Sequence, residues 1–413
     1  MRILVISQYF WPENFRINDL CSELVLRGHE VTVLTGKPNY PEGKTFKEYL
    51  DDPKKFDFFK GCNVVRVPML ARGKRGGELI LNYITFALSA MFIGAWKLKK
   101  KQFDVIFVFE PSPITIGLPA VFLKKIKKVP VIFWVLDLWP ETLEAVGVVK
   151  SPGILGLVGR LVAFIYNHCD LVLGQSKAFY SGISRYCKDE AKIKYFPSWS
   201  ESVFLDSQVK PVFDMAKHEN CFKVLFAGNI GDAQDFPALV KAVEILKNKQ
   251  ARVKVFIVGD GRAMSWLESA ILKYDLVDYI YLLGRHPLES MPSFYASADA
   301  LFVSLKESSV FSMTIPGKLQ SYMMAGKPIL TMLSGEGSRV IDEANCGLTA
   351  RSGDAETLAE NMLKMSLLNK DEREILGDNA RLYSEQFFNR DKLISQLEGW
   401  FVDVVDNDKE KNR

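Results

Sequence analysis

A Pro-Gly-Lys turn at residues 316–318 places a lysine at the start of a predicted helix. Unpaired N–H groups and the positive end of the helix dipole gather at such a start, so it can hold a diphosphate. Lys318 adds a mobile full charge there. The alternative is an ordinary helix start with a solvated lysine. An apolar strand, Ala300–Val303, and a polar loop precede the turn, and this order favours the anion site.

Two glycine-containing loops add groups suited to the same anion. Gly228, Asn229 and Gly231 follow one predicted strand, and Gly259 follows the next. Glycine lets backbone N–H groups approach a phosphate closely. We interpret the loop of Gly228, Asn229 and Gly231 as a diphosphate contact, with an ordinary turn as the alternative.

Polar side chains also follow the predicted strands of the first half of the chain. They are Glu13 and Asn14, then Lys37, Asn39 and Tyr40, then Glu110, and finally Asp137 and Glu141. Because the carboxyl ends of parallel strands meet at one edge of a sheet, we expect these loops to form one wall of a site. Two alternatives remain open: Asp137 caps the helix that begins near Pro140, and Glu110 simply ends its strand.

No pair of acids suited to a metal lies in a predicted site loop. Asp51 and Asp52 are adjacent, but they fall in a surface-like segment. The six cysteines are scattered without a CxxC pair, which argues against a zinc site or a disulfide framework and fits a reduced, cytoplasmic setting. We therefore predict that the protein needs no metal or other cofactor.

Strand-like apolar runs alternate with helical patterns along the whole chain, which indicates parallel βαβ units. The pattern restarts after Phe222, so two doubly wound parallel sheets are predicted. Ligands of such α/β sheets bind beyond the carboxyl ends of the strands, so the expected site is the cleft between the two domains. The predicted strands are Ile3–Ser7, Val31–Thr35, Val64–Val67, Val105–Phe109, Val131–Val135 and Leu171–Gly174, then Lys223–Ala227, Val253–Val258, Ile280–Leu282, Ala300–Val303, Ile329–Met332 and Gly347–Thr349.

The expected domains are residues 1–200 and residues 201–387. The less regular stretch from Trp199 to Asn220 is the expected hinge. A terminal helix within residues 388–413 is expected to pack back on the first domain.

The ordered motifs of the chain resemble those of a retaining glycosyltransferase of family 4. That family has the GT-B fold, in which two Rossmann-like domains face an interdomain cleft. The combination of FWPEN, PNYP, DLWPE and GNIG is similar to the branch that builds bacterial O-antigen and capsule polysaccharides, including transfer of N-acetyl-L-fucosamine. The supporting segments are SQYFWPENFRINDLCSELVLRGHEVTVLTGKPNYPEGK at 7–44, VLDLWPETL at 135–143, FAGNIGDAQDF at 226–236, VGDG at 258–261, SADALFVSL at 297–305 and IPGKLQSYMMAGKPIL at 315–330.

The resemblance implies a UDP-sugar donor, a polyprenyl-diphosphate-linked saccharide acceptor, and transfer with retention of configuration. It implies that Lys318 stabilises the leaving diphosphate and that Asp137 contacts or polarises the acceptor hydroxyl. The implied donor-binding residues are Gly228, Asn229, Gly231, Gly259, Arg285 (at uracil), Ser312, Thr314, Pro316, Gly317 and Ser321, and the implied acceptor-binding residues are Glu13, Asn14, Asn39, Tyr40 and Glu141.

The chain departs from the family's paired glutamates, a Glu-x7-Glu signature. The second glutamate, which grips the ribose, aligns with Ser321, and the first aligns with Met313. Glu307 is the nearest acid, but it lies 14 residues before Ser321. A serine hydroxyl donates and accepts at ribose more weakly than a carboxylate does.

The charge distribution indicates an anionic partner for the first half of the chain. Residues 1–202 carry 28 Lys/Arg and 19 Asp/Glu, whereas residues 203–413 carry 25 and 30. Lysines cluster at 97–101 and 124–128 after apolar runs, which resembles a surface beside an anionic membrane rather than a nucleic-acid face. We therefore expect peripheral binding to the inner face of the cell membrane, and no nucleic-acid partner.

The apolar segment Leu79–Leu98 has three open interpretations: a buried helix, an interfacial helix and a membrane span. Two other functions also stay open. One is a UDP-sugar 2-epimerase of similar architecture. Epimerisation requires several acids and histidines around the sugar, and the chain has only four histidines, which argues against this alternative. The other is a catalytically inactive, membrane-associated partner protein. A dehydrogenase is disfavoured because neither half carries a G-x-G-x-x-G motif after its first strand.

Overall fold

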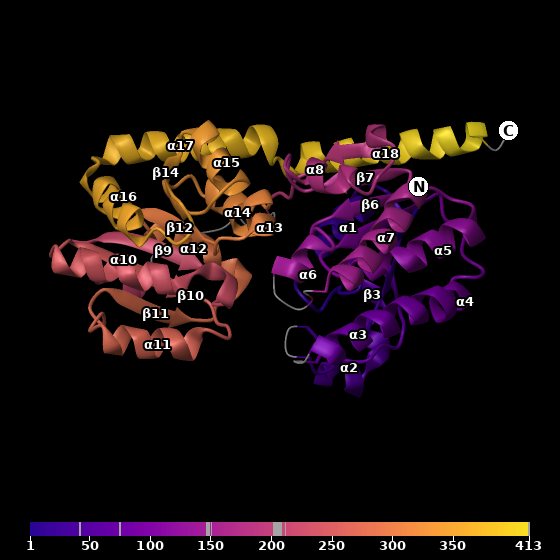
Figure 1. The fold of residues 1–413 in the computed structure, drawn as a ribbon, viewed down its shortest axis with the longest axis horizontal. Helices are drawn as coiled ribbons and strands as arrows, with labels where there is room; N and C mark the ends of the chain where they lie inside the picture. Colours follow the sequence, from indigo (N-terminus) through magenta and orange to yellow (C-terminus); the bar gives the residue numbers. More distant parts are fainter. Residues whose placement is uncertain are drawn as a thin grey trace. The chain divides into compact units, whose positions relative to one another are not determined.

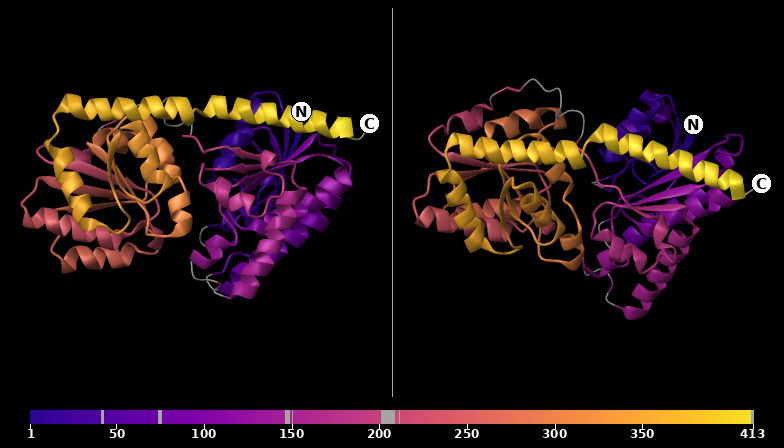
Figure 2. Two further views of the ribbon diagram at one scale, coloured as in Figure 1. Left: turned by 45° about the horizontal axis from the view of Figure 1, so that its top comes forward. Right: turned by 90° about the horizontal axis from the view of Figure 1, so that it is seen from above.

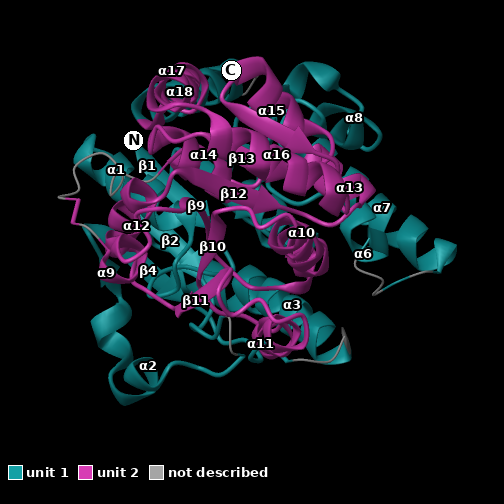
Figure 3. Ribbon diagram, turned by 90° about the vertical axis from the view of Figure 1, so that its left-hand side faces the viewer, with its two compact units in different colours: residues 1–197, 391–413 teal, residues 198–390 magenta. Residues whose placement is uncertain are grey.

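The computed structural model describes residues 1–40, 43–73, 76–145, 149, 151–200, 209–210 and 212–411. The chain forms two compact units, residues 1–197 with 391–413, and residues 198–390 (Figures 1 and 3). The expected junction between residues 200 and 201, and much of the expected hinge, lie at or within residues 201–208 and 211, outside the described residues.

The first unit is built on an eight-stranded sheet of order β3-β4-β2-β1-β5-β6-β7-β8. All its pairings are parallel except β3 with β4. Strands β5 and β6 are buried throughout, as expected of strands covered on both faces. The strands are β1 (Arg2–Ile6), β2 (Glu30–Thr35), β3 (Phe58–Phe59), β4 (Cys62–Arg66), β5 (Val105–Glu110), β6 (Val131–Val135), β7 (Leu171–Gly174) and β8 (Ile193–Tyr195).

Helices cover both faces of this sheet. Phe133 and Trp134 of β6 point to opposite faces because successive strand residues alternate. The Phe133 ring lies 5.8 Å from Tyr166 of α7, whereas Trp134 contacts Phe196, whose ring lies 5.7 Å from Trp400 of α18. The helices are α1 (Arg16–Leu26), α2 (Lys47–Asp51), α3 (Gly76–Ser89), the π-helical η2 (Ala90–Gly94), α4 (Ala95–Lys97), α5 (Gly117–Lys127), α6 (Glu141–Ala145), α7 (Pro152–His168), α8 (Phe179–Ser184) and α18 (Arg390–Lys411).

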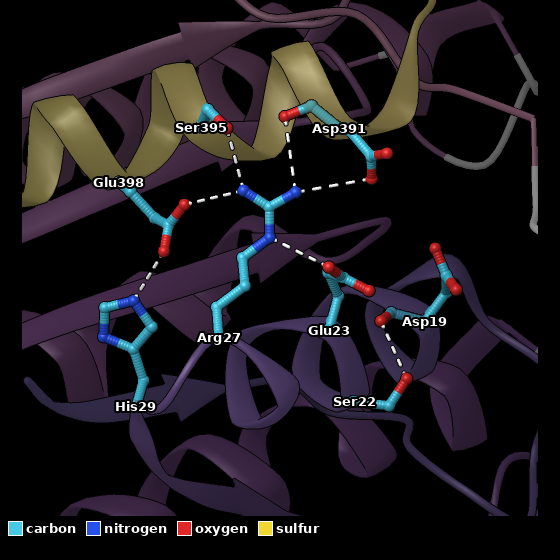
Figure 4. Close-up of polar contacts among 8 residues, drawn as sticks. All are labelled: Asp19, Ser22, Glu23, Arg27, His29, Asp391, Ser395 and Glu398. Carbon is cyan, nitrogen blue, oxygen red and sulfur yellow. Dashed lines mark hydrogen bonds and ion pairs between the residues drawn. The ribbon is translucent and has the colours of Figure 1, made fainter.

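The last helix, α18, lies on the first unit beside the N-terminus, as both views of Figure 2 show. The Arg27 guanidinium, just after α1, donates to Ser395 Oγ at 2.8 Å and to Glu398 Oε2 at 2.9 Å (Figure 4). The other oxygen of Glu398 lies 2.7 Å from His29 Nε2. The ring of Phe401 packs at 5.9 Å on Phe107 of the central sheet. Polar and apolar contacts therefore fasten the two ends of the chain together.

The second unit is built on a six-stranded parallel sheet of order β11-β10-β9-β12-β13-β14. Alternate residues feed two cores: Val224 and Phe226 of β9 face one, and Leu225 and Ala227 face the other. The strands are β9 (Phe222–Ala227), β10 (Val253–Val258), β11 (Ile280–Gly284), β12 (Ala300–Ser304), β13 (Ile329–Met332) and β14 (Gly347–Ala350). The helices are α9 (Phe213–Ala216), α10 (Phe236–Asn248), α11 (Met264–Lys273), α12 (Met291–Ser297), α13 (Ser309–Met313), α14 (Gly317–Met324), α15 (Glu336–Ala344), α16 (Ala355–Leu367) and α17 (Lys370–Phe387).

The two-domain α/β fold class that the sequence predicts is confirmed, and two local predictions need correction. The polar loop before the Pro-Gly-Lys turn contains the short helix α13. The short edge strands β3 and β8 had not been predicted, because two or three residues carry too little periodicity.

Candidate functional site

Three neighbouring strands of the second unit end in glycines with positive φ. These are Gly228 after β9 (145°), Gly259 after β10 (139°) and Gly284 at the end of β11 (73°). Gly259 N donates to Gly284 O at 2.8 Å, and Gly228 N donates to Val258 O at 2.9 Å. A Cβ on Gly259 would lie 1.9 Å from Gly228 O, so the close approach of these backbones excludes a side chain. The edge therefore presents bare backbone at the point where the strand order reverses between β9 and β12.

Helix α14 brings Lys318 to this glycine edge. Tyr322, one turn further along, accepts from Ala227 N at 2.8 Å and donates to Ala227 O at 3.2 Å, which fixes α14 against the end of β9. Lys318 Nζ then lies 2.9 Å from the position that a Cβ of Gly228 would occupy. Sequence reasoning missed Tyr322, although its four-residue spacing from Lys318 places both on one helix face.

Within the part of the chain that the structure describes, the ammonium of Lys318 contacts neutral groups. It donates to the neutral Gln234 Oε1 at 3.2 Å and lies 3.7 Å from the centroid of the Phe226 ring. Burial lowers the pKa of Lys318 to about 7, so near neutral pH about half of this group is protonated. A bound anion would favour the charged form, which is the property expected of a diphosphate-binding lysine.

The other residues predicted at the donor pocket lie around this edge with different environments. Asn229 is exposed in the loop after β9, and Arg285 is exposed in the loop after β11. Because β11 is the second strand from β9, the distance between these two strands is about 10 Å. Gly231 follows Ile230, whose N–H donates to Asp260 O at 2.9 Å and joins this loop to the one after β10. This span suits a ligand with one end at Lys318 and the other near Arg285.

The start of α14 differs in part from the expectation. Pro316 precedes the helix and Gly317 is its exposed first residue, whereas Ser321 is buried, at 5% exposure. Ser312 Oγ donates to Ser309 O at 2.8 Å and Thr314 Oγ1 donates to Val310 O at 3.0 Å. These two hydroxyls hold the turns of α13, and only their remaining lone pairs are available to a sugar. The sequence predicts a loop here, so it does not reveal that these hydroxyls are already hydrogen-bonded.

Glu307, the nearest acid to the missing pair, is occupied elsewhere. Its Oε2 accepts from Ser334 Oγ at 2.8 Å, and the side chain is exposed. It is therefore bound to the loop after β13 rather than to the start of α14.

The corresponding edge of the first unit is acidic. Glu13, after β1, is buried and accepts from the N–H groups of Asn39 and Tyr40, each at 2.7 Å, and of Phe10 at 3.1 Å. Burial raises the pKa of Glu13 to about 7, although these three donors oppose the shift. Glu13 therefore organises the loop that carries Asn39 and Tyr40, and Asn14 beside it is exposed.

Asp137 and Glu110 form an acidic pair at the same edge, at the ends of β6 and β5. Burial raises the pKa of Asp137 to about 6, against a 2.5 Å hydrogen bond that its Oδ1 accepts from Thr142 Oγ1 of α6. Burial and then the charge of Asp137 raise the pKa of Glu110 well above its ordinary value. Tyr83 of α3 is close enough to Arg72 and to both acids for their charges to affect its pKa. The sequence predicts a role for Asp137 but leaves open whether Glu110 belongs to the site or only ends its strand. The complete burial of Glu110 beside Asp137 favours a place in the site.

Tyr40 belongs to a tyrosine cluster beside this pair. Its ring lies 5.3 Å from that of Tyr9, and the guanidinium of Arg72 lies 5.4 Å from the Tyr40 ring. Glu141 forms a 3.4 Å ion pair with Arg185 of the loop after α8. Burial, and then the charges of Glu110, Glu141 and Asp137, raise the pKa of Tyr166, so Glu141 lies near the acidic pair, and its acceptor-binding role stays a prediction.

Among the described residues, no group of three or more His, Cys, Asp or Glu side chains could hold a metal ion. The six cysteines are free thiols. Metal independence thus stays a prediction for activity measurements.

Two family models match the chain. Residues 14–199 match the glycosyl transferase 4-like domain, and residues 221–367 match glycosyl transferases group 1. Together the two models span most of both structural units.

Named relatives agree with these models. The chain is 28% identical over 266 residues to the probable glycosyltransferase WbjE of Pseudomonas aeruginosa, a match covering 61% of this chain and 65% of that protein. It is 23% identical over 347 residues to WcaI of Escherichia coli K12, a putative colanic acid biosynthesis glycosyl transferase, covering 79% and 82%. The match thus spans less than two thirds of the length of WbjE.

The fold is also that of solved glycosyltransferase structures. HepE of Anabaena, crystallised with UDP and glucose, superposes with a TM-score of 0.68 at 16% identity, covering 98% of this chain and 100% of that one. At such low identity, this likeness concerns the fold alone.

Proposed function

Because the chain belongs to the group 1 glycosyl transferases, we propose that it transfers a sugar from a UDP-sugar to a polyprenyl-diphosphate-linked saccharide with retention of configuration. The proposed sugar is N-acetyl-L-fucosamine or a related N-acetyl-hexosamine, and the proposed process is O-antigen or capsule synthesis. The name of WcaI, which refers to colanic acid biosynthesis, supports a polysaccharide product. UDP bound to HepE supports the nucleotide.

One observation carries this proposal: the half-buried Lys318 ammonium beside the glycine edge. A diphosphate placed there would meet the lysine, the backbone of the Gly228 loop and the N-terminal end of α14. Each of these interactions strengthens as negative charge builds up on the departing UDP, so they stabilise the transition state more than the bound substrate.

The proposed reaction breaks the bond between the sugar's anomeric carbon and the β-phosphate oxygen. A new bond to the acceptor oxygen forms on the same face, and the acceptor proton passes to the leaving diphosphate. The proposed role of Asp137 is to orient and polarise the acceptor hydroxyl. With a pKa of about 6, this carboxyl group is mostly ionised at neutral pH and can accept that hydrogen bond.

The test is to incubate the purified protein with UDP-N-acetylhexosamines and a synthetic polyprenyl-diphosphate-linked saccharide. We expect a lengthened lipid-linked product that retains the donor's anomeric configuration by NMR, and activity in the presence of EDTA. An epimerised UDP-sugar would instead identify a 2-epimerase. No product with any UDP-sugar, despite tight UDP binding, would identify an inactive partner protein.

A further inference from the structure

The segment α3–η2–α4 has one face embedded in the first unit. Among the described residues, the helix at Gly77–Lys97 is long and apolar enough to cross a membrane, with a mean hydropathy of 1.7. However, Asn82, Phe86 and Ala90 are completely buried, and Asn82 Oδ1 accepts from Gln8 Nε2 at 2.7 Å. A membrane span would have to remove these residues from the core, so the structure disfavours that interpretation.

The opposite face of the same segment is apolar and exposed. Its large side chains are four residues apart. In a regular α-helix such a row would turn gradually around the helix axis. The π-helical turn η2 has more residues per turn than an α-helix, so it keeps the row closer to one face. The stripe is Ile80, Ile84, Leu88, Phe92 and Trp96, with exposed fractions of 48, 44, 49, 60 and 65%.

Helix α7 presents a second apolar stripe on the same side of the sheet. Ile154, Leu157 and Phe164 are exposed at helical spacing. Helix α5 joins the two stripes: its Phe122 ring lies 5.9 Å from Phe92, and its Lys124 Nζ donates to the carbonyl of His168 at the end of α7. The labels α3, α4, α5 and α7 can be followed on this unit in Figure 1.

Basic residues predominate on this face. Residues 79–103, 111–136 and 152–168 contain nine Lys or Arg and no Asp or Glu. The nearest acids are Glu78, exposed in the first turn of α3, and Asp170, which pairs with Lys124 at 2.5 Å. Lys127 Nζ donates to the carbonyls of Leu98 and Lys101 at 2.6 and 2.8 Å, which joins the basic end of α5 to that of α4. The exposed lysines around this junction are Lys99, Lys100, Lys125 and Lys128.

We propose that this face, formed by the outer stripes of α3–η2–α4 and α7 with the lysines around residues 99 and 125, docks onto an anionic phospholipid bilayer. Apolar side chains would enter the interface while lysines bind the lipid phosphates. Lys99 Nζ lies 5.4 Å from the Trp96 ring, which places charge and aromatic side chain at one level, as at a bilayer interface. A second copy of this chain is the alternative occupant, but the exposed lysines Lys99, Lys100, Lys125 and Lys128 on each face would oppose such a dimer.

Docking would also bring the bilayer close to the acidic edge of the same unit. Helix α3 carries Tyr83, beside Asp137 and Glu110, and an α-helix with its side chains is only about 10–12 Å across. A lipid-linked acceptor could then reach this edge without leaving the membrane. This consequence rests on the proposed function, whereas the docking does not.

The test is sedimentation of the full chain with vesicles of phosphatidylcholine, with or without phosphatidylglycerol. We expect binding to the anionic vesicles that weakens with added salt. Leu88→Glu and Trp96→Glu should each weaken vesicle binding about tenfold or more. Each substitution removes apolar area that the bilayer would bury and adds a negative charge that the anionic lipids repel. Lys99→Glu with Lys100→Glu should weaken it similarly. Leu272→Glu, on α11 of the second unit and 71% exposed, is the matched control and should bind as the parent does.

Circular dichroism and UDP binding would verify that each variant is folded. The proposal is overturned if the parent protein does not bind anionic vesicles, or if the Leu88→Glu and Leu272→Glu variants bind them equally well. It is also overturned if light scattering shows a dimer that the Leu88→Glu substitution dissociates without changing vesicle binding. A transferase assay on a detergent-solubilised acceptor separates this outcome from a failure of the proposed reaction.

Discussion

The carboxyl edges of the two sheets share a topology but differ in chemistry. In each unit the strand order reverses beside the first strand, between β1 and β5 and between β9 and β12. The first edge holds Glu13, Glu110 and Asp137, and burial raises the pKa of each carboxyl group. The second holds three positive-φ glycines and Lys318, whose pKa burial lowers.

This difference teaches that burial shifts the pKa values of Lys318, Glu13 and Asp137 to about 6 or 7, so that a bound ligand can change the protonation state of these groups. A half-protonated lysine suits a ligand that brings negative charge, whereas carboxyl groups of raised pKa suit one that brings hydroxyls. The two edges are therefore expected to respond to substitution and to pH in different ways.

The largest expected effect is on the lysine edge. Lys318→Met should lower kcat about 100- to 1,000-fold, the usual cost of removing one group that stabilises a developing negative charge. Steady-state transfer assays would measure it. Lys273→Met, an exposed lysine at the end of α11, is the control and should leave kcat unchanged. Equal activity of the two variants would remove the basis for the anion site.

The glycine edge should tolerate no side chain at Gly259. Gly259→Ala is expected to destabilise the second unit by about 2–3 kcal/mol, because the residue has a positive φ and its Cβ would clash with Gly228 O. Thermal unfolding with and without UDP would measure this. Gly284→Ala, also of positive φ but with open space around its Cβ, should cost only about 1 kcal/mol. Similar costs for both would show that close backbone approach is unimportant.

On the acidic edge, Asp137→Asn should lower kcat about 10- to 100-fold while leaving UDP affinity unchanged. In the parent, kcat/KM should fall as the pH falls through about 6, where this carboxyl group becomes protonated. Thr142→Val removes the hydroxyl that binds Asp137 but keeps the charge. If Thr142→Val reduces kcat as much as Asp137→Asn does, Asp137 serves only to hold α6.

UDP-sugar affinity should respond to pH through Lys318. Below pH 7 the ammonium is already protonated, whereas above pH 7 binding must include proton uptake, so the affinity should fall about tenfold between pH 6 and pH 8. Calorimetry in buffers of different ionisation enthalpy would detect the proton. A UDP-sugar is the right probe because its diphosphate does not itself titrate in this range. A flat profile would place the lysine away from the diphosphate.

The smallest expected effect concerns Ser321. Ser321→Ala should weaken UDP binding about 2- to 10-fold, the value of one hydrogen bond. The same substitution should not weaken binding of 2′,3′-dideoxy-UDP, which lacks the ribose hydroxyls. Equal weakening of both ligands would mean that the serine acts on the packing of α14, where it is buried, rather than on ribose.

Sequence periodicity predicted nearly all the long elements, because parallel strands such as β6 and β10 are continuous apolar runs. It also predicted Lys318 at the start of a helix and Asp137 in a loop that follows a strand. It missed what depends on distant contacts: the hydrogen bonds of Tyr322 that fix α14 to β9, and the ion pair between Arg185 and Glu141. The outward face of the segment at 79–98 was similarly undecided, since helical spacing does not reveal which side the sheet covers.

The contacts of Arg27 and His29 with Glu398 have a consequence for biosynthesis. The first unit is made first on the ribosome but needs residues 391–413 to be complete. Until residues 391–411 have been synthesised, Phe107 lacks its contact with Phe401, so part of the core of the first unit stays exposed in the nascent chain. Deleting residues 391–413 would therefore destabilise the unit that is synthesised first.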